Sequence, residues 1–312
     1  MLFGTYRYYC RLENDAELPF YKGSTFRGVF GRALKKVVCA LKLQECGECL
    51  LRQRCIYTQV FETELAQAPA ANARVIPPPH PFVIEPPETN QTFFPAGSKF
   101  DFSLLLFGKV NQAFPYFLYS FDQMGRIGIG RKINGERGRF GLESVECNGD
   151  IVYTSEDQRL KTTNGLQTLR LEAPPESHEH FKIKITIETP LRLKFENRFR
   201  ADLPFHVFVR GMLRRTSSLL ATYGDGEPDI DYKGLVKRAE TVRIAASDLS
   251  WFDWRRYSFR QDKDMLMGGI VGSVTYEGGI GEFLPLLDFC AKVHLGKQTA
   301  FGLGKFTSER VP

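Results

Sequence analysis

One order of secondary structure is predicted twice along this chain, and this repeat limits the folds that the chain can adopt. Each half has a strand, a basic amphipathic helix, further strand material, a strand, a short helix, a glycine-rich basic loop and a strand. The order β-α-β-β-α-β is that of the ferredoxin-like unit. Two such units also account for the 312 residues, because an ordinary domain has roughly 150. We therefore predict an α+β protein with two tandem ferredoxin-like domains.

The first half opens with the aromatic-rich segment 3–12, which suits a strand. Ser24 is the expected N-cap of the helix that follows, because the apolar residues from Phe26 to Leu41 are spaced alternately by three and one. A proline-rich segment at 76–88 cannot be regular helix or central strand. The other predicted elements are a strand at 100–107, a helix at 113–124, a glycine- and arginine-rich loop at 125–141 and a strand at 142–146.

The chain becomes polar between residues 154 and 180, and this predicts a boundary between domains 1–175 and 176–312. The second half opens with strict alternation of apolar and polar residues at 181–188, the pattern of a half-buried strand. Asp202 and Pro204 are start signals for a second amphipathic helix. A strand at 266–276, a helix at 281–291 and a glycine-rich loop at 294–305 are predicted to follow.

Four of the seven cysteines fall within 17 residues, after the first predicted helix: Cys39, Cys46, Cys49 and Cys55. Thiolates at this spacing can hold one metal ion in a closed tetrahedral site, which leaves no position for a catalytic water. We predict one structural zinc that folds a four-cysteine insertion at this point. An iron–sulfur cluster uses the same ligands, and four unrelated buried thiols are a further alternative. The other three cysteines are predicted to be core residues: Cys10, Cys147 and Cys290.

The two glycine-rich loops predict close contact with a phosphate backbone. Glycines let backbone N–H groups approach a phosphate, and Lys297 and Lys305 flank the second loop. The second loop is not a Walker loop, because Gly304-Lys305 is followed by Phe306. Both loops occupy equivalent places in the repeat. This repetition favours nucleic-acid binding over a pair of mobile surface loops.

Composition sets limits on partners and compartment. The net charge of +6 permits an anionic partner without requiring one. No apolar run approaches the roughly 18 residues of a membrane span, so an integral membrane protein is not expected. The first residues have no small-residue cleavage site and reach a carboxylate at Glu13, so we expect no signal peptide and a cytoplasmic protein.

Seven short motifs occur in a characteristic order. They are the four-cysteine segment running into Tyr57 and Phe61-Glu62, P-F-V-I-E-P-P at 81–87, G-R-I-G-I-G-R at 125–131, T-P-L-R-L-K at 189–194, V-R-G-M-L-R-R at 209–215, Y-S-F-R-Q at 257–261 leading to G-G-I-V-G, and V-H-L-G-K-Q-T-A-F-G-L-G-K-F at 293–306. In this order they resemble the RAMP superfamily of CRISPR-associated proteins, and more narrowly the endoribonucleases that process precursor crRNA.

The resemblance implies two tandem ferredoxin-like domains that bind CRISPR repeat RNA and cut it once per repeat. It implies metal-independent chemistry, in which a 2′-hydroxyl attacks the adjacent phosphate and leaves a 2′,3′-cyclic phosphate and a 5′-hydroxyl. No cofactor is expected for catalysis, and other CRISPR effector subunits are possible partners. On this basis we predict an RNA-binding surface formed by Lys297, Thr299 and Lys305 and extended by Arg210, Arg214, Arg126, Arg131 and Arg260.

Histidine suits the proton transfers of this reaction, because its reference pKa is about 6.5. Many members of the resembled family carry a general-base histidine on or just after the first helix, but residues 24–61 contain none. His294 and His206 are the two histidines beside predicted RNA-binding elements. We rank His294 first as general acid or base and His206 second, with Tyr257 as a residue that positions the nucleophile.

Two other functions remain open on the sequence. One is a non-catalytic RAMP subunit that binds guide RNA in a CRISPR effector complex. The other is a zinc-bearing DNA-binding or redox protein, whose function would lie in the cysteine segment. Cleavage of repeat RNA in EDTA separates the endoribonuclease from the non-catalytic subunit.

Overall fold

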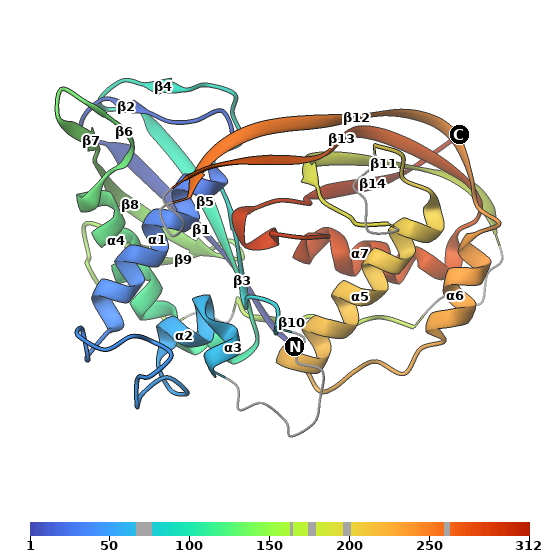
Figure 1. Ribbon diagram of the computed structural model, residues 1–312, viewed down its shortest axis with the longest axis horizontal. Coiled ribbons are helices and arrows are strands. Elements are labelled where there is room, and N and C mark those ends of the chain that lie inside the picture. Colours follow the sequence, from blue (N-terminus) through green and yellow to red (C-terminus); the bar gives the residue numbers. More distant parts are fainter. Residues whose placement is uncertain (67–76, 163–164, 174–178, 196–200, 259–262) are drawn as a thin grey trace. The chain divides into compact units, whose positions relative to one another are not determined.

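The computed structural model describes residues 1–66, 77–162, 165–173, 179–195, 201–258 and 263–312. It divides into two compact units, Met1–Thr168 and Leu169–Pro312, which are unit 1 and unit 2 below (Figure 1). The division that the sequence predicts between residues 175 and 176 stays a prediction, because it falls within 174–178, outside the described residues.

Unit 1 contains an antiparallel sheet with the order β3-β5-β1-β8-β9, in which β10 also pairs with β1. Its strands are β1 (Leu2–Leu12), β3 (Phe82–Glu85), β5 (Lys99–Phe107), β8 (Phe140–Cys147), β9 (Asp150–Thr154) and β10 (Gln167–Thr168). A small sheet has the order β4-β2-β6-β7, formed by β2 (Ala16–Glu17), β4 (Phe93–Phe94), β6 (Ile129–Ile133) and β7 (Glu136–Gly138). The helices are α1 (Gly23–Val38), α2 (Ile56–Phe61), α3 (Thr63–Ala66) and α4 (Phe114–Ile127), with a 3₁₀ helix at Gly108–Ala113.

Aromatic side chains join α1 and α4 to one face of the larger sheet. Phe30 of α1 stacks on Phe121 of α4 with ring centroids 4.4 Å apart. The Phe121 ring also contacts Tyr8 of β1 at 4.7 Å and Phe102 of β5 at 4.9 Å. All four side chains are buried. The three-and-one spacing of apolar residues in the first predicted helix therefore does mark a face that packs on the core, as the sequence indicates.

Two local predictions in unit 1 are wrong. Lys22, not Ser24, occupies the N-cap position of α1, and no side chain caps this helix. The segment 125–141 is not a loop, because it contains the last turn of α4 and the hairpin of β6 and β7. Gly130 has φ +80°, and a Cβ there would overlap the carbonyl oxygen of Glu17, so this glycine allows the small sheet to close.

Unit 2 contains an antiparallel sheet with the order β12-β13-β11-β14. Its strands are β11 (His180–Leu191), β12 (Arg243–Ser258), β13 (Lys263–Gly279) and β14 (Phe306–Val311). The helices are α5 (Phe205–Tyr223), α6 (Tyr232–Ala239) and α7 (Leu284–Val293), with 3₁₀ helices at Gly281–Phe283 and Thr299–Phe301. The sequence does not predict α6.

The helices α5 and α7 pack on one face of this sheet (Figure 1). Phe205 and Phe208 of α5 contact Tyr276 of β13, and Phe208 also meets Phe306 of β14 edge to face at 5.2 Å. The buried Tyr276 hydroxyl donates a hydrogen bond of 2.6 Å to the Leu203 carbonyl. These contacts fix the start of α5 against the sheet.

Both units show the same order of their longer elements. The order is β1-α1-β3-β5-α4-β8 in unit 1 and β11-α5-β12-β13-α7-β14 in unit 2. In each sheet the second strand of the six elements lies beside the third, the third beside the first, and the first beside the fourth. The chain is thus a mixed α and β protein with antiparallel sheets, and the internal repeat that the sequence indicates is present as a repeat of topology.

Candidate nucleic-acid interface

The glycine-rich segment 294–305 joins α7 to β14 and forms a compact structure on unit 2. The Leu295 amide donates a hydrogen bond of 2.9 Å to the Gly304 carbonyl, and the Lys297 amide donates one of 2.9 Å to the Arg192 carbonyl at the end of β11. Gly304 has φ +77°, and a Cβ there would overlap the Leu295 carbonyl oxygen. Much of the segment is buried, so it is a packed part of the unit and not a mobile surface loop.

Arg215 of α5 holds the start of this segment. It is buried, and it donates hydrogen bonds of 2.8 Å to the Val293 carbonyl and 3.2 Å to the His294 carbonyl. Burial lowers the pKa of Arg215 to about 10. These bonds satisfy two carbonyl groups where α7 ends, and they tie the segment to α5.

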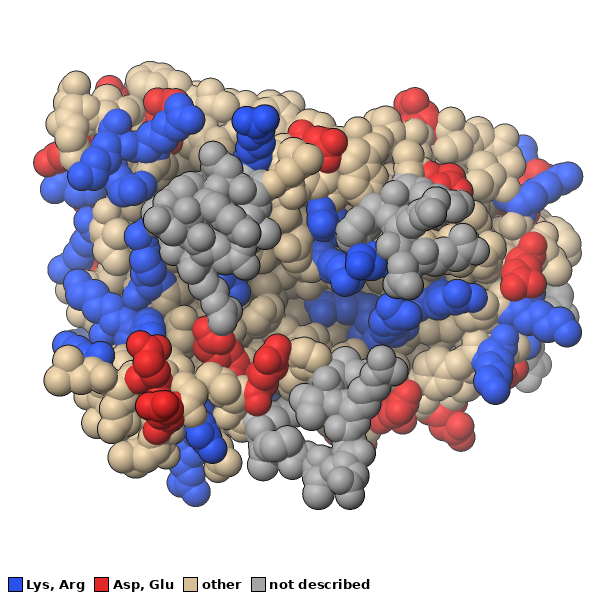
Figure 2. Space-filling view, viewed as in Figure 1, with Lys and Arg blue, Asp and Glu red and all other residues tan. Residues whose placement is uncertain are grey.

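Four cationic side chains gather where the glycine-rich segment meets the end of β11. We call them the cation cluster: Arg192, Lys194, Arg214 and Lys297. The pKa of Lys297 is lowered, first by partial burial and then by the positive charges of Lys194, Arg192 and Arg214. Lys297, Lys194 and Arg214 are exposed, and Figure 2 shows Lys and Arg side chains gathered on the face of unit 2 that carries α5. Mutual repulsion of this kind is relieved when an anion binds.

One face of α5 continues from the cation cluster. His206, Arg210 and Arg214 are spaced by four residues, so they follow one another along the helix surface. His206 is half-buried, and its ring meets Phe195 edge to face at 5.7 Å. The Arg210 guanidinium lies 5.9 Å from the centroid of the same phenyl ring. An aromatic ring beside an arginine is an arrangement on which bases of single-stranded RNA stack.

The structure therefore brings together three of the predicted RNA-binding residues and one predicted catalytic residue: Lys297, Arg210, Arg214 and His206. The sequence missed Arg192 and Lys194, although both lie in the motif at 189–194. Arg192 reaches the segment through a bridge to Gly296, a pairing between distant parts of the chain that no local pattern announces.

The two other predicted residues of this segment have different surroundings. Thr299 is buried at 7% exposure in the 3₁₀ turn, where its carbonyl accepts a bond of 2.7 Å from the Gly302 amide. The Lys305 ammonium lies 3.6 Å from a Glu188 carboxylate oxygen. The negative charge of Glu188 partly neutralises the Lys305 ammonium, so Lys305 attracts a phosphate less strongly than an unpaired lysine would.

His294, the first-ranked catalytic candidate, lies in the interior of unit 2. Its side chain is 1% exposed, and Nδ1 lies 3.2 Å from the Leu303 carbonyl oxygen. Its backbone has φ +58°, a conformation that links the end of α7 to the glycine-rich segment. This geometry fits a residue that anchors the segment and leaves the imidazole without access to an RNA strand.

The remaining predicted residues are placed as follows. Arg126 forms a salt bridge of 3.1 Å with Asp122 one turn earlier in α4, and Arg131 of β6 lies 3.3 Å from Glu17. Both arginines belong to unit 1. Tyr257 lies in β12, in a part of the strand whose side chains are not described, and Arg260 lies outside the described residues. The roles predicted for these residues stay predictions.

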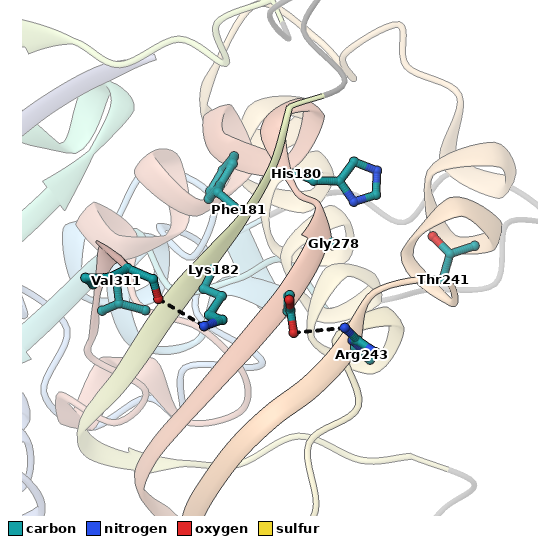
Figure 3. A pocket seen from close by; sticks show the side chains of 9 residues that line it. His180, Phe181, Lys182, Thr241, Arg243, Gly278 and Val311 are labelled. Atoms are coloured by element: carbon teal, nitrogen blue, oxygen red, sulfur yellow. Dashed lines mark hydrogen bonds and ion pairs between the residues drawn. The ribbon is translucent and has the colours of Figure 1, made fainter.

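A separate cavity of about 640 Å³ opens at the other end of β14 from the glycine-rich segment (Figure 3). It is lined by His180, Phe181, Lys182, Thr241, Arg243, Glu277, Gly278, Val311 and Pro312. Arg243 pairs with Glu277 at 3.2 Å, and the Lys182 ammonium donates to the Pro312 carbonyl at 3.1 Å. The Glu277 carboxylate offsets the charge of Arg243, so the cavity wall has a smaller net positive charge than its two cations alone would give.

The four cysteines of the predicted zinc site all line one small cavity of about 20 Å³ beside the end of α1. Cys39 directly follows α1, and Cys55 directly precedes α2. Within the described residues, no group of three or more His, Cys, Asp or Glu side chains has the arrangement needed to hold a metal ion. Neither the zinc nor the insertion is supported by this geometry alone, and both stay predictions.

Two family models match this chain. Residues 1–165 match the N-terminal domain AF_1859_N, and residues 185–306 match the CRISPR-associated endoribonuclease Cas6. A curated protein of Archaeoglobus fulgidus, described as uncharacterized, is 24% identical over 297 residues, which cover 93% of this chain and 92% of that protein.

Solved structures with similar folds include a Cas6 from Thermus thermophilus and a Cas6 product complex. The first has 12% identity and a TM-score of 0.54 over 99% of this chain and 98% of that one, and the second has 15% identity and a TM-score of 0.55 over 99% of both. A partial Cas6-RT-Cas1–Cas2 complex has 17% identity and a TM-score of 0.57 over 99% of this chain. This chain spans 46% of that longer protein.

The N-terminal match covers more than half of the chain, and the second match contains the glycine-rich segment and α5. The chain belongs to the family in which an AF_1859_N domain precedes a domain of the CRISPR-associated endoribonuclease Cas6. Within the part of the chain that the structure describes, none of the helices combines the length and the apolar character of a membrane span.

Proposed function

We propose that this chain is an endoribonuclease that binds CRISPR repeat RNA and cuts it within precursor crRNA. The observation that carries the proposal is the cation cluster, which three backbone segments assemble inside the domain that matches Cas6. Neutralising phosphates is the main source of affinity for RNA of any sequence. The curated relative has no described activity, so the proposed substrate rests on the family and on this cluster.

We further propose that both units are ferredoxin-like domains, with the four-cysteine segment inserted after α1 of the first. The repeated order of elements and the repeated order of strands support this assignment. Other CRISPR proteins are proposed as partners, because a similar fold occurs in a solved Cas6-RT-Cas1–Cas2 complex.

The exposed face of α5 defines a proposed path for the RNA strand. Arg214 lies beside Lys297 in the cation cluster, and His206 lies eight residues earlier in the helix, about 12 Å away at a rise of about 1.5 Å per residue. A strand that leaves a phosphate on the cluster and follows this face passes Arg210 and Phe195 before it reaches His206. This path places a base on the Phe195 ring and a phosphate within reach of the imidazole.

The proposed reaction needs two proton transfers and no metal. A base removes the proton of the 2′-hydroxyl as its oxygen attacks the adjacent phosphorus, and an acid protonates the departing 5′-oxygen, which leaves a 2′,3′-cyclic phosphate. Arginine and lysine side chains offset the negative charge that develops on the phosphate. His206 takes the proton-transfer role that the sequence ranks first for His294, because His206 is accessible and lies on the same face as the cations.

Single-turnover cleavage of labelled repeat RNA in EDTA tests the proposal. His206→Ala should lower the cleavage rate about 10²–10⁴-fold, the range for general acid–base catalysis, and should leave RNA affinity nearly unchanged. His180→Ala is the matched control, because His180 lines the separate cavity of unit 2. If the wild-type protein binds repeat RNA without cutting it, the proposed cleavage activity is refuted and the alternative of a non-catalytic RAMP subunit is supported.

The salt dependence of affinity tests the binding surface independently of cleavage. Each phosphate contact lowers log K by about 0.7 per decade of salt for a single strand, so Lys297→Ala should reduce the slope by about 0.7. Lys305→Ala should change the slope less, because Lys305 already has Glu188 beside it. Equal slopes for wild type and Lys297→Ala would remove Lys297 from the surface.

A further inference from the structure

In the segment between α1 and α2 the apolar side chains are exposed, whereas in a hydrophobic core they would be buried. Leu43 and Leu50 point into solvent, with exposed fractions of 102% and 76%. No residue of 40–54 is buried, although the structure describes all of them. Within this stretch the residues that are not exposed are Leu41, Cys46 and Cys49. Burial of apolar side chains therefore cannot be what holds this segment together.

The four cysteines are less exposed than Leu43 and Leu50, and each is half-buried. Cys39 and Cys55, at the two ends of the segment, line the same cavity as Cys46 and Cys49. The turn between the inner pair is closed by a hydrogen bond of 3.4 Å from the Cys49 amide to the Cys46 carbonyl. The structure records all four as free cysteines. Four cysteines from one short segment thus line a single cavity of about 20 Å³.

We propose that Cys39, Cys46, Cys49 and Cys55 bind one zinc ion as thiolates and that this ion holds the segment between α1 and α2 in place. Each thiol releases its proton on binding, so the site has four thiolates around a divalent cation and a net charge of −2. In the described conformation the four side chains do not have the arrangement needed to hold an ion, so binding would bring them to Zn–S distances of about 2.3 Å.

Two cations beside the cavity balance this charge. Lys35, in the last turn of α1, lines the cavity, and its ammonium lies 5.4 Å from the ring centroid of Tyr57, which also lines it. Arg52 lines the cavity and donates a hydrogen bond of 2.6 Å to the Gly47 carbonyl, inside the turn between Cys46 and Cys49. Outer groups of this kind orient thiolate ligands and stabilise their charge.

The role of the ion is structural. Four protein ligands fill a tetrahedral site, so no water or substrate can bind zinc there. The site closes a loop of residues 39–55 against the end of α1 and the start of α2, where the chain has no core of its own. This inference does not depend on the proposed RNA cleavage.

Metal analysis of the purified full chain tests the site. We expect about one zinc per chain, and cobalt substitution should give the charge-transfer and ligand-field bands of a tetrahedral thiolate site. The double variant Cys46→Ser, Cys49→Ser should lose the metal. Cys290→Ala, which removes a thiol buried beside Thr216 in unit 2, should keep it. A wild-type chain that contains no metal and takes up neither zinc nor cobalt refutes the proposal, as does iron with sulfide.

Limited trypsin digestion reports on the segment itself and separates local loosening from global misfolding. Lys42, Arg52 and Arg54 are exposed cleavage points within it. The double variant and the zinc-stripped wild type should be cut there faster than the zinc-loaded wild type, with both units otherwise intact. Leu43→Ser, which changes a fully exposed side chain, should be cut at the wild-type rate. Equal cutting of loaded and stripped protein would overturn the structural role.

Discussion

Replacing Gly304 with alanine tests whether the close contact of this residue with Leu295 shapes the RNA-binding surface. The φ of +77° alone costs about 1–3 kcal/mol for a side-chain-bearing residue. The new Cβ would also overlap the Leu295 carbonyl oxygen, so the backbone at Leu295 and at residue 304 must separate and the bond from the Leu295 amide to the residue 304 carbonyl is lost. That bond adds about 0.5–1.5 kcal/mol, and disrupted packing brings the total to about 4 kcal/mol or more.

Gly226→Ala is the matched control within unit 2. Gly226 has φ +128°, but nothing lies within 4 Å of the position of its Cβ, so this variant has the conformational cost without the overlap. Both tryptophans, Trp251 and Trp254, lie in unit 2, so their fluorescence during urea unfolding reports this unit for both variants. RNA affinity should fall for Gly304→Ala and stay near wild type for Gly226→Ala. Equal unfolding midpoints for the two variants would refute the reasoning.

Two further predictions concern charged groups of unit 2. Arg215→Met leaves two buried carbonyls without their donors, which costs about 1–3 kcal/mol each and is partly offset because a cation is no longer buried. Thermal unfolding should show a larger loss of stability than for Arg210→Met, which changes an exposed residue of α5. An equal loss would contradict the role of Arg215 in tying the glycine-rich segment to α5. Lys297 has a lowered pKa in the free chain, and a bound phosphate raises this pKa, so RNA binding takes up a proton only at pH values around and above the free-chain pKa. Affinity is full below the free-chain pKa and falls as the pH rises through it. Lys297→Arg should abolish that alkaline decline, since arginine stays charged, and titration of affinity against pH measures it.

Local periodicity predicted the elements of this fold, because helix and strand patterns depend on neighbouring residues. The alternation at 181–188 lies within β11, and the apolar spacing from Phe26 lies mostly within α1. The helix ends at Val38 instead of reaching Leu41, because the backbone becomes extended at Cys39. The hairpin of β6 and β7 was missed, since glycines with positive φ form it and apolar alternation does not.

The candidate site was less predictable, because neighbouring residues of one type have different environments. Arg214 and Arg215 are adjacent, but the first is exposed in the cation cluster and the second is buried under the glycine-rich segment. A signal for this difference existed in the sequence. Arg215 is three residues after Met212 and four before Leu219, in phase with the apolar stripe of α5. The sequence had no such signal for the burial of His294, because its imidazole contacts the carbonyl of Leu303, at the far end of the glycine-rich segment.

The position of β14 in the sheet has a consequence for how unit 2 folds. β14 is the last strand of the unit to be synthesised, and it pairs with β11, the first, across nearly the whole length of the family-matched domain. Pairings between such distant segments form late, because a long loop must close before they gain any contacts. The glycine-rich segment is held between α7 and β14, so the surface proposed to bind RNA takes shape only when the nascent unit is complete. An unfinished chain can thus begin to fold without being able to capture RNA.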